Sequence, residues 1–269
     1  PLRGSIAAVA ESARNVSCVG ALPVAITNNL NFASPETEIG YWQLSTACEG
    51  ISIACEALET PVTGGNVSLY NESIDDEGNK KPIQPTPVIG MVGVLDNVKQ
   101  AVSSGWKNIN DEIWIIGSRD SGLTLGATSY LEYFHGQITG RPPSLNLIDE
   151  KLCQLFIRNG ILNNLIISSH DISDGGLAIA LAEACILSDK GASINLIADK
   201  RIDSLLFSEG GSRIIFSISH MKKNEWLKFV SEESKNFTDS IYVTKIGTVL
   251  QDTLKIKISD NIICDLKIS

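Results

Sequence analysis

The stretch that decides the fold reads Thr63-Gly64-Gly65-Asn66-Val67-Ser68-Leu69-Tyr70-Asn71-Glu72-Ser73. Successive side chains of an extended chain point to opposite faces, so Val67 and Leu69 share one face. The opposite face receives the uncharged polar groups of Asn66, Ser68 and Tyr70. The alternation therefore predicts a β-strand with one apolar face and a line of neutral oxygen and nitrogen atoms on the other.

The two glycines at the start of this strand indicate a binding function. Without Cβ atoms, Gly64 and Gly65 let a ligand approach the backbone closely. Asn66 and Ser68 offer neutral oxygen ligands or hydrogen bonds. This set suits a phosphate with a hard cation better than a haem, a thiolate-bound metal or a hydride carrier. The competing interpretation is a Gly-Gly turn before an edge strand whose Asn and Ser face water.

Composition describes an ordinary globular protein. The chain has 269 residues, of which 43% are hydrophobic and 20% charged, and this fits two domains or one large one. The net charge is −9 and no basic stripe is present, so nucleic acid is not expected as a partner. A helix terminus or a metal could still hold a small anion locally. The chain begins with Pro1 rather than Met, so we expect a piece of a longer protein.

No sequence signal directs the chain to a membrane or out of the cytoplasm. No apolar run approaches the ~20 residues that span a bilayer, and no basic segment precedes an apolar one as in a signal peptide. We therefore expect a cytoplasmic protein with no membrane partner. The six cysteines form no C-x-x-C pair, so we expect reduced thiols that pack as small core residues.

The first part of the chain mixes helical and extended patterns. We expect a helix over 5–20, with Ser5 as its N-cap and Gly20 as its end. Ser34 and Pro35 are expected to start the next helix, with Pro at the first helical position after a Ser cap. The remaining expected elements are strands at 22–27, 63–73 and 86–95 and a long helix at 38–58.

The middle of the chain contains the expected domain boundary. Residues 74–83 are charged and turn-rich, and they predict a solvated hairpin loop without the spacing of a calcium site. Order is lost over 96–111, which divides the chain into domains 1–108 and 109–269. Strands and helices then mingle without strict alternation, which favours an α+β fold over a doubly wound parallel sheet. We expect helices at 122–134, 147–159, 177–187 and 223–235, and strands at 112–117, 165–168, 192–197, 213–219, 242–250 and 254–266.

Motifs exclude several common active sites. The chain has no P-loop G-x-x-x-x-G-K-[ST], no Rossmann G-x-G-x-x-G and no G-x-S-x-G nucleophile elbow. The three histidines, His135, His170 and His220, are too far apart in sequence for a zinc signature. The remaining candidates are the polar strand ends, a second cluster of acids and glycines, and Glu209. Glu209 could bind a hydroxyl, a metal or Arg213, and a turn with a local salt bridge fits it equally well.

The second cluster is the run Ser169-His170-Asp171-Ile172-Ser173-Asp174-Gly175-Gly176. Gly175 and Gly176 could expose backbone N–H groups at the start of a helix. Asp171 and Asp174 would then face a magnesium ion that carries phosphates. A simple capping role for Asp174 on the following helix is the competing interpretation.

Four motifs occur in a fixed order and together identify a family. They resemble the C-terminal half of the small, PurL-type phosphoribosylformylglycinamidine synthases, within the AIR synthase or PurM-like superfamily. The resemblance covers essentially the whole chain. The motifs are Thr27-Asn28-Asn29-Leu30-Asn31-Phe32 with Pro35-Glu36, Gly65-Asn66-Val67-Ser68-Leu69-Tyr70-Asn71-Glu72, Pro85-Thr86-Pro87-Val88-Ile89-Gly90-Met91-Val92-Gly93, and His170-Asp171-Ile172-Ser173-Asp174-Gly175-Gly176-Leu177.

The resemblance implies a PurM-like fold and a defined reaction. Each half of such an enzyme has an N-terminal α/β domain that pairs into a barrel-like core, followed by an α+β domain. The reaction converts formylglycinamide ribonucleotide, ATP and glutamine-derived ammonia to formylglycinamidine ribonucleotide, ADP and phosphate. The implied partners are the N-terminal half of the same chain, a glutaminase subunit and a small bridging subunit of the PurQ and PurS types.

The same resemblance implies roles for individual residues. Asn28 and Gly65 match ATP contacts, Asn66 matches a magnesium ligand and Ser68 matches a substrate contact. Position 28 is usually Asp in the family, so Asn28 keeps an acceptor oxygen and loses the charge. The segment 125–131 also lacks the family's usual Gly-Ser-Glu.

The remaining motifs imply an auxiliary site rather than a catalytic one. Asp171, Asp174, Gly175 and Gly176, with Glu209 and Arg213, are expected to line a pseudo-symmetric pocket that holds nucleotide. The family's catalytic histidine and most magnesium-binding acids belong to the other half, so we expect no catalytic residue here and no turnover.

The sequence leaves three other functions open and also predicts that the chain associates with itself. The chain could belong to an aminoimidazole ribonucleotide synthetase or a selenophosphate synthetase, although the motifs at 27–36 and 66–72 argue against both. It could instead be a non-catalytic half that binds nucleotide as a scaffold. An isolated half is also expected to pair with a second copy of itself.

Overall fold

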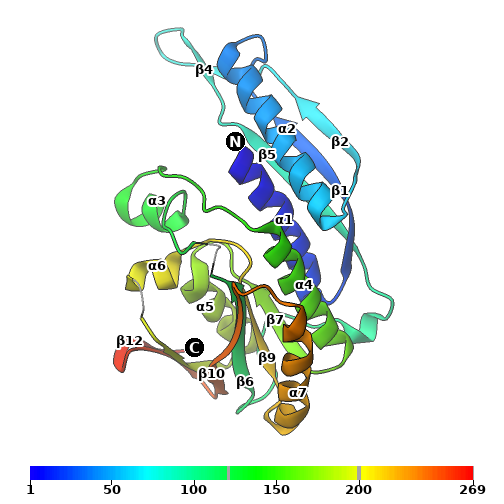
Figure 1. Ribbon diagram of the computed structural model, residues 1–269. Coiled ribbons are helices and arrows are strands. Elements are labelled where there is room, and N and C mark those ends of the chain that lie inside the picture. The colour runs from blue at the N-terminus through cyan, green and yellow to red at the C-terminus, as the bar shows by residue number, and fades with distance from the viewer. Residues whose placement is uncertain (120–121, 199–200, 269) are drawn as a thin grey trace.

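The computed structural model describes residues 1–119, 122–198 and 201–268, and two sheets organise them (Figure 1). The smaller sheet has the order β2-β1-β5. Its central strand runs parallel to β2 and antiparallel to β5. Its elements are α1 (Leu2–Val19), β1 (Leu22–Asn31), α2 (Glu38–Leu58), β2 (Val62–Ser68) and β5 (Thr86–Val94).

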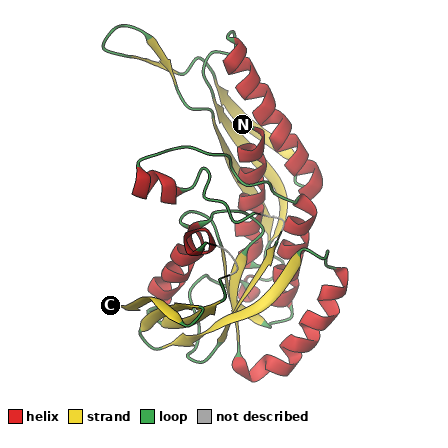
Figure 2. Cartoon of the chain, turned by 60° about the vertical axis from the view of Figure 1, so that its left-hand side comes forward, coloured by secondary structure: helices red, strands yellow, loops and turns green. Residues whose placement is uncertain are grey.

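Helices α1 and α2 cover one face of this small sheet, as Figure 2 also shows from the side. Val9 and Ala13 of α1 and Ala54 of α2 pack with the fully buried Ile26 of β1. Small residues on the helices let both approach the sheet closely. No described helix covers the opposite face, which we call the open face. Val88, at 50% exposure, lies on it.

Two predicted helix N-caps, Ser5 and Ser34, are wrong. Gly20 ends α1 in the left-handed conformation, with φ of 99°, as expected. Ser5 is not the N-cap, because α1 begins three residues earlier and Ser5 is buried inside it. Thr37, not Ser34, caps α2, and its side chain accepts a hydrogen bond from Gly40 N at 3.1 Å.

A two-stranded hairpin, β3 (Glu72–Ile74) and β4 (Lys80–Pro82), projects from the end of the small sheet (Figure 1). It confirms the expected hairpin at 74–83. Asp75 Oδ1 accepts hydrogen bonds from Asn79 N at 2.8 Å and Glu77 N at 3.1 Å. The acid therefore closes the turn. The short 3-10 helix η1 (Val98–Gln100) then leads to the second sheet.

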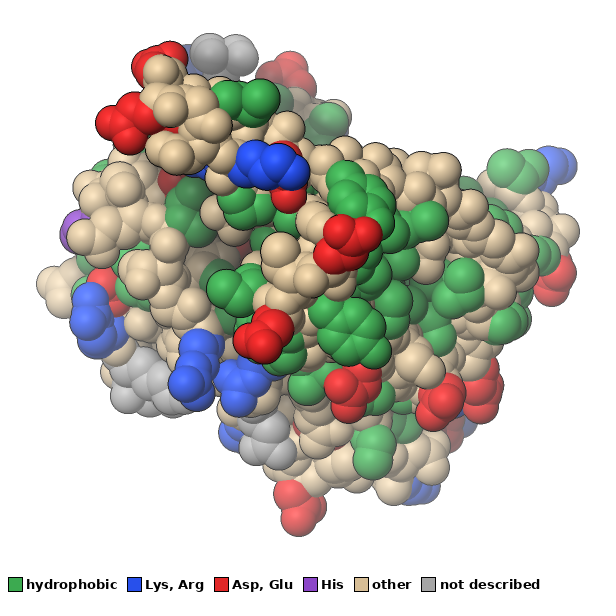
Figure 3. All heavy atoms as spheres, turned by 90° about the horizontal axis from the view of Figure 1, so that it is seen from above, with side chains coloured by type: hydrophobic (Ala, Val, Ile, Leu, Met, Phe, Trp, Pro, Cys, Tyr) green, Lys and Arg blue, Asp and Glu red, His purple; other side chains and the backbone are tan. Residues whose placement is uncertain are grey.

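The start of α2 exposes large apolar side chains at the same end of the molecule. Ile39, Tyr41 and Trp42 are 70%, 65% and 54% exposed. Figure 3 looks down on this end and shows hydrophobic side chains gathered between acidic ones.

The larger sheet has seven strands in the order β12-β11-β8-β10-β6-β9-β7. Most neighbours are antiparallel, and β8 and β11 are parallel. Mixed pairing with interspersed helices confirms the α+β prediction. The strands are β6 (Glu112–Ser118), β7 (Ile166–Asp171), β8 (Gly191–Leu196), β9 (Ile214–Ile218), β10 (Ile241–Leu250), β11 (Thr253–Ile258) and β12 (Asn261–Lys267).

Helices lie on both faces of this sheet. Successive side chains of β6 point to opposite faces of the sheet. Trp114 and Ile116 pack towards α4 and α7 on one face. Ile113 and Ile115 pack towards α5 and α6 on the other. Both faces of the strand are covered, so all seven of its residues are buried. The helices are α4 (Leu147–Leu162), α5 (Gly176–Ser188), α6 (Ile202–Phe207) and α7 (Lys223–Glu233), with short 3-10 turns η2 (His220–Lys222) and η3 (Ser234–Asn236).

The expected helix at 122–134 is wrong over its first half. The helix α3 spans only Ser129–His135. Before it, Gly126 lies so close to the Arg141 backbone that a Cβ would be 2.5 Å from Arg141 O. Ala127 adopts a positive φ of 57° and donates its N–H to Thr139 O at 2.8 Å. These contacts with residues 139–141 hold Gly126 and Ala127 in a turn and keep residues 122–127 out of a helix. The sequence prediction also missed α6.

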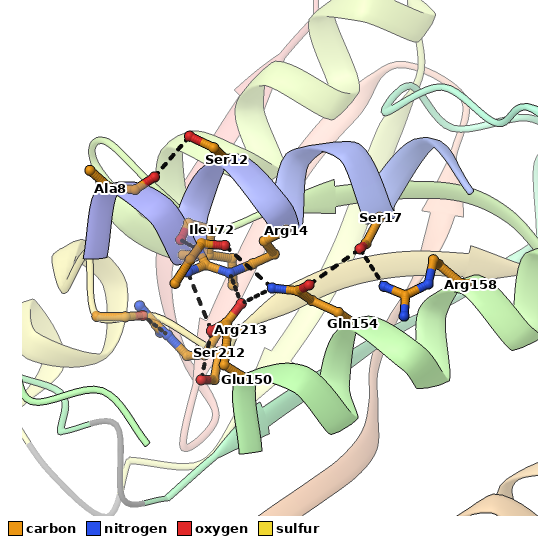
Figure 4. A network of polar contacts seen from close by, with 12 residues as sticks. Ala8, Ser12, Arg14, Ser17, Glu150, Gln154, Arg158, Ile172, Ser212 and Arg213 are labelled. Atoms are coloured by element: carbon orange, nitrogen blue, oxygen red, sulfur yellow. Dashed lines mark hydrogen bonds and ion pairs between the residues drawn. The ribbon is translucent and has the colours of Figure 1, made fainter. Parts of the chain in front are cut away.

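A buried polar network joins the two parts of the molecule (Figure 4). Arg14 of α1 donates its Nε–H to Glu150 Oε1 of α4 at 2.9 Å, and both side chains are almost fully buried. Ser212 Oγ and Gln154 Nε2 also donate to Glu150, at 2.8 and 2.9 Å. Arg14 Nη1 donates to Ile172 O at 3.4 Å. The segment that carries the second polar cluster is therefore tied to α1 of the small-sheet unit.

The cysteines are free thiols, and four of the six are buried, as expected for core residues. The other two are Cys48, which is exposed on α2, and Cys264, which is half-buried on β12. Among the helices of the described residues, none is both long and apolar enough to cross a membrane.

Candidate functional site

The polar residues at the ends of β1 and β2 form the first candidate site. The two strands are in parallel register, with Asn28 opposite Gly65, Asn29 opposite Asn66, and Asn31 opposite Ser68. Paired residues of neighbouring strands share a face. Sequence alternation and strand pairing therefore gather the amides and hydroxyls of two separate motifs at one end of the sheet.

Residues Asn66 and Ser68 lie on the open face of the small sheet. The Asn66 amide nitrogen donates to Asn29 Oδ1 at 3.2 Å, which turns the Asn66 carboxamide oxygen outward. Ser68 Oγ donates to Asn71 Oδ1 at 3.1 Å. Asn66 is exposed and Ser68 is half-buried. Neither side chain is sealed in apolar packing, so both are available to a ligand that lies on this face.

Residues Asn28 and Gly65 lie on the other side of the sheet, facing α2. The Asn28 side chain occupies the space that a residue-65 side chain would fill, since a Cβ on Gly65 would be 2.1 Å from Asn28 Oδ1. A Cβ on Gly64 would have no described atom within 4 Å. Gly65 thus makes room for Asn28, whereas Gly64 leaves the edge of the sheet open.

A cavity of about 510 Å³ adjoins Asn28 between α2 and the start of β2. Ile51, Cys55 and Val62 contribute apolar walls to it. Because β2 is an edge strand of the sheet, this cavity and the open face are separated only by the width of that strand. The strand expected over 63–73 is shorter than predicted, because β2 ends at Ser68. Tyr70 has a positive φ of 61° and is not part of the strand, and its hydroxyl donates to Glu36 Oε1 at 3.2 Å.

The second candidate site is a cavity of about 210 Å³ between α1 and the start of α5. Asp174 and Glu209 line it, together with Glu11 and Arg14. Burial raises the pKa of the Glu11 carboxyl; the Arg14 charge opposes this, and the carboxylates of Asp171, Asp174 and Glu209 raise it further. The cavity is therefore acidic. Asp174 does not cap α5, whose N-cap is Gly175 with φ of 76°.

The glycines beside this cavity do not offer free N–H groups. Gly175 N donates to Glu209 Oε1 at 2.8 Å, and Gly176 N donates to Ser173 O at 2.9 Å. Glu209 Oε1 also accepts from Ser129 N at 2.8 Å. The expectation of an anion site on these N–H groups is therefore wrong for this conformation, because a carboxylate already occupies one of them. The arrangement suits a cation or hydrogen-bond donors.

The two remaining predicted residues lie outside this cavity. Asp171 is 3% exposed, and its Oδ1 lies 3.3 Å from His170 Nδ1. Burial opposes ionisation of Asp171, but hydrogen bonding from His170 and the positive charge of Arg14 lower its pKa overall. Arg213 is buried and lines a different cavity, on the α5 side of the large sheet.

The donor set can be compared with what a magnesium ion needs. Among the described residues, no three His, Cys, Asp or Glu side chains cluster closely enough to hold a metal by themselves. Mg²⁺ commonly keeps several waters and takes one or two protein oxygens plus substrate phosphates. The outward Asn66 carboxamide oxygen fits such a single contribution.

The sequence analysis missed Asn29 as a member of the site. It orients Asn66, and the neighbouring Asn-Asn pair in the first motif was the available signal. The Arg14–Glu150 network was also missed, because its two residues are 136 positions apart and only the fold brings them together.

Comparison with known proteins then decides the family. The description "AIR synthase related protein, N-terminal domain" matches residues 1–95, and "AIR synthase related protein, C-terminal domain" matches residues 108–253. The chain belongs to the AIR synthase related protein family. The resemblance inferred from the four motifs is thereby confirmed.

Two curated relatives of the chain carry the same name. Over all 269 residues the chain is 68% identical to phosphoribosylformylglycinamidine synthase subunit PurL of Prochlorococcus marinus strain AS9601, of which it covers 34%. It is 48% identical over 260 residues, 94% of this chain, to the same subunit of strain MIT 9313, of which it covers 33%. The chain spans about a third of the length of these relatives.

Solved structures support the AIR synthase related fold. The chain superposes on T. maritima PurL complexed with ATP with a TM-score of 0.71 and 18% identity, covering 99% of this chain and 40% of that one. E. coli HypE, a hydrogenase maturation protein, gives a TM-score of 0.65 and 14% identity, with coverage of 98% and 79%. Both likenesses concern the fold.

Proposed function

We propose that this chain is the C-terminal half of an ATP-dependent phosphoribosylformylglycinamidine synthase of purine biosynthesis. The observation that carries the proposal is the register of β1 and β2, which sets Asn28 beside Gly65 and Asn66 beside Asn29. The relatives that share up to 68% of its residues are named as subunits of that synthase. Its reaction would consume formylglycinamide ribonucleotide, ATP and ammonia.

The geometry supports a nucleotide that crosses the edge of β2. An adenosine group would occupy the cavity of about 510 Å³ beside Asn28, with Ile51 and Val62 along its apolar portion. The phosphates would pass over Gly64, where no described side chain obstructs the strand edge, and beside the Asn28 side chain at Gly65. They would then reach the open face beside Asn66 and Ser68.

Each residue in this arrangement has a separate task. Asn28 would accept a hydrogen bond from the nucleotide through a neutral oxygen. Asn66 would contribute its carboxamide oxygen to Mg²⁺, which neutralises phosphate charge when bound. Ser68 would hydrogen-bond the amide substrate and hold it close to the phosphates, so that proximity lowers the barrier.

The chain supplies binding and orientation, and we expect the catalytic histidine to come from the N-terminal half of the same protein. PurQ- and PurS-type subunits would deliver ammonia, consistent with a similar solved structure described as PurLQS from Thermotoga maritima. The acidic cavity lined by Asp174 and Glu209 would be an auxiliary site that holds the magnesium ion of a nucleotide, and Gly175 would support it through its hydrogen bond to Glu209.

The test is activity of the complete gene product with ammonia as nitrogen donor. Formation of formylglycinamidine ribonucleotide together with ADP is expected, and Asn66→Ala should reduce kcat/KM by about 10²-fold or more. Asn79→Ala, on the exposed hairpin turn, is the matched control. The isolated chain should give no turnover. Full activity of the Asn66→Ala enzyme, or turnover by the isolated chain, would contradict the proposal.

A further inference from the structure

The largest cavity described above has no part in the proposed reaction. It measures about 570 Å³ and lies at the edge of the large sheet where β6 and β8 end and β10 begins. None of its described lining residues also lines the acidic cavity or the cavity beside Asn28. Its size is within the range of small-molecule sites.

The charged residues that line this cavity all have the same sign. Arg119, Arg213 and Lys245 contribute to its wall, and none of its described lining residues is Asp or Glu. The whole chain carries a net charge of −9. Three cations around one cavity of an acidic protein create a local positive potential that favours an anion.

Arg213 is the most unusual of the three cations. Its side chain is only 2% exposed, and no described Asp or Glu pairs with it. Nε donates to Gly210 O at 3.2 Å and Nη2 donates to Ser208 O, so its hydrogen bonds to described residues all go to backbone carbonyls. Burial lowers its pKa to about 10. Burying a cation without a counter-charge is costly, and an anion in the cavity would relieve that cost.

The other two cations that line the cavity have different partners. Arg119 Nη1 donates to Asp239 O at 3.3 Å, and its guanidinium carbon lies 5.7 Å from the centre of the Tyr242 ring. Lys245 Nζ is 2.7 Å from Glu112 Oε1, so its charge is already paired. Of the three cations that line the cavity, Arg119 and Arg213 are therefore the two that have no carboxylate partner among the described residues.

The rest of the cavity wall is apolar. Leu177 of α5, Leu205 of α6 and Ile115 of β6 contribute to it, and Tyr242 adds an aromatic ring. Such a wall removes the body of a ligand from water, while the guanidinium groups recognise oxygen pairs through their planar forks.

We propose that this cavity binds an organic anion that carries a phosphate or carboxylate group on a flat apolar body of one or two rings. Arg213 and Arg119 hold the anionic group, and the leucine and isoleucine side chains cover the rings. The site is independent of the proposed synthase reaction. A ligand there would contact α5, the helix whose start also forms the acidic cavity.

The test uses 1-naphthyl phosphate and 1-naphthoate as probes, with isothermal titration calorimetry on the 269-residue chain. We expect at least one of them to bind saturably with a Kd on the order of 0.1–1 mM, and the stronger of the two identifies the anionic group. Neutral 1-naphthol and inorganic phosphate should each bind at least about tenfold more weakly, because each lacks one half of the recognised chemistry.

Three variants separate this site from adventitious binding. Arg119→Gln removes an exposed cation and should weaken binding by about five- to tenfold. Arg213→Lys keeps the charge and loses the fork, and it should weaken binding by about tenfold or more, with circular dichroism checking its fold. Lys228→Gln, on α7 at the opposite face of the sheet, should change nothing. Absence of saturable binding by both probes, equal binding of 1-naphthol, or unchanged affinity in Arg119→Gln would overturn the proposal.

Discussion

The pair Gly64 and Gly65 offers a sharp test of how the first site is built, because alanine should have opposite effects at adjacent positions. In Gly65→Ala the new Cβ would be 2.1 Å from Asn28 Oδ1 and 2.6 Å from Asn28 O. The side chain can rotate away, but the backbone oxygen can move only if β1 and β2 separate locally. Overpacking of this kind typically costs about 1–3 kcal/mol.

In Gly64→Ala the Cβ enters open space, with no described atom within 4 Å. The main effect is then a smaller conformational entropy of the unfolded chain, which raises the free energy of unfolding by about 0.4–1 kcal/mol. The difference between the two variants is therefore expected to be about 1.5–4 kcal/mol. Each variant is the matched control for the other, since both add one methyl group at neighbouring positions.

Urea denaturation followed by circular dichroism measures that difference directly. Calorimetric titration with Mg²⁺ and ADP measures the second consequence, which is loss of the Asn28 contact in Gly65→Ala. We expect its nucleotide affinity to fall by about tenfold, equivalent to one neutral hydrogen bond of about 1.4 kcal/mol. Equal stability of the two variants would refute the packing argument, because it would mean that Asn28 does not require a glycine opposite it.

Three further outcomes follow from the structure. Glu150→Ala should cost about 3–5 kcal/mol, because it leaves the Arg14 charge buried and unpaired, whereas the double variant Arg14→Met/Glu150→Met should cost less in chemical denaturation; a larger cost for the double variant would contradict this. Burial disfavours the His170 cation, but Asp171 and Glu183 raise the pKa of His170 overall. The ion pairs of His170 therefore stabilise the fold fully below the unfolded pKa of ~6.5, and this stabilisation is lost as the pH rises through the folded pKa. His170→Gln should therefore destabilise more at about pH 5.5 than at about pH 9, and a pH-independent effect would exclude the ion pairs. The isolated chain should self-associate through the open face, so light scattering at micromolar concentrations should give a mass above 29.0 kDa, and a strictly monomeric mass would reject that pairing.

Periodicity predicted the elements whose packing is local and regular. The buried strand around Ile113 to Ile116 and the long helix at 38–58 follow from hydrophobic runs of the right length, and both are present. The helix expected at 122–134 failed because Gly126 and Ala127 contact residues 139–141, which no local pattern reveals.

The candidate site was predictable in composition and less so in geometry. The sequence motifs contained Asn28, Gly65, Asn66 and Ser68, and the parallel register of two strands brings them together. Which of these residues lie on the open face of the sheet and which face α2 depends on the side of the sheet that the helices cover. Arg213 lies two residues before Ile215, so both side chains point to the face of the large sheet that α5 covers. No local feature of the sequence shows that Arg213 lines this cavity rather than the acidic one.

Paramagnetic relaxation tests most directly whether magnesium and nucleotide bind across the β2 edge. Mn²⁺, which prefers the same oxygen ligands as Mg²⁺, replaces it together with ATP and broadens the amide resonances of residues near the ion in the heteronuclear NMR spectrum of the chain. The account predicts strong broadening at Gly65, Asn66 and Ser68, with Asn66→Ala abolishing it there. Unbroadened β2 resonances at saturating Mn²⁺ and ATP would contradict it, even if resonances near Asp174 and Glu209 were affected.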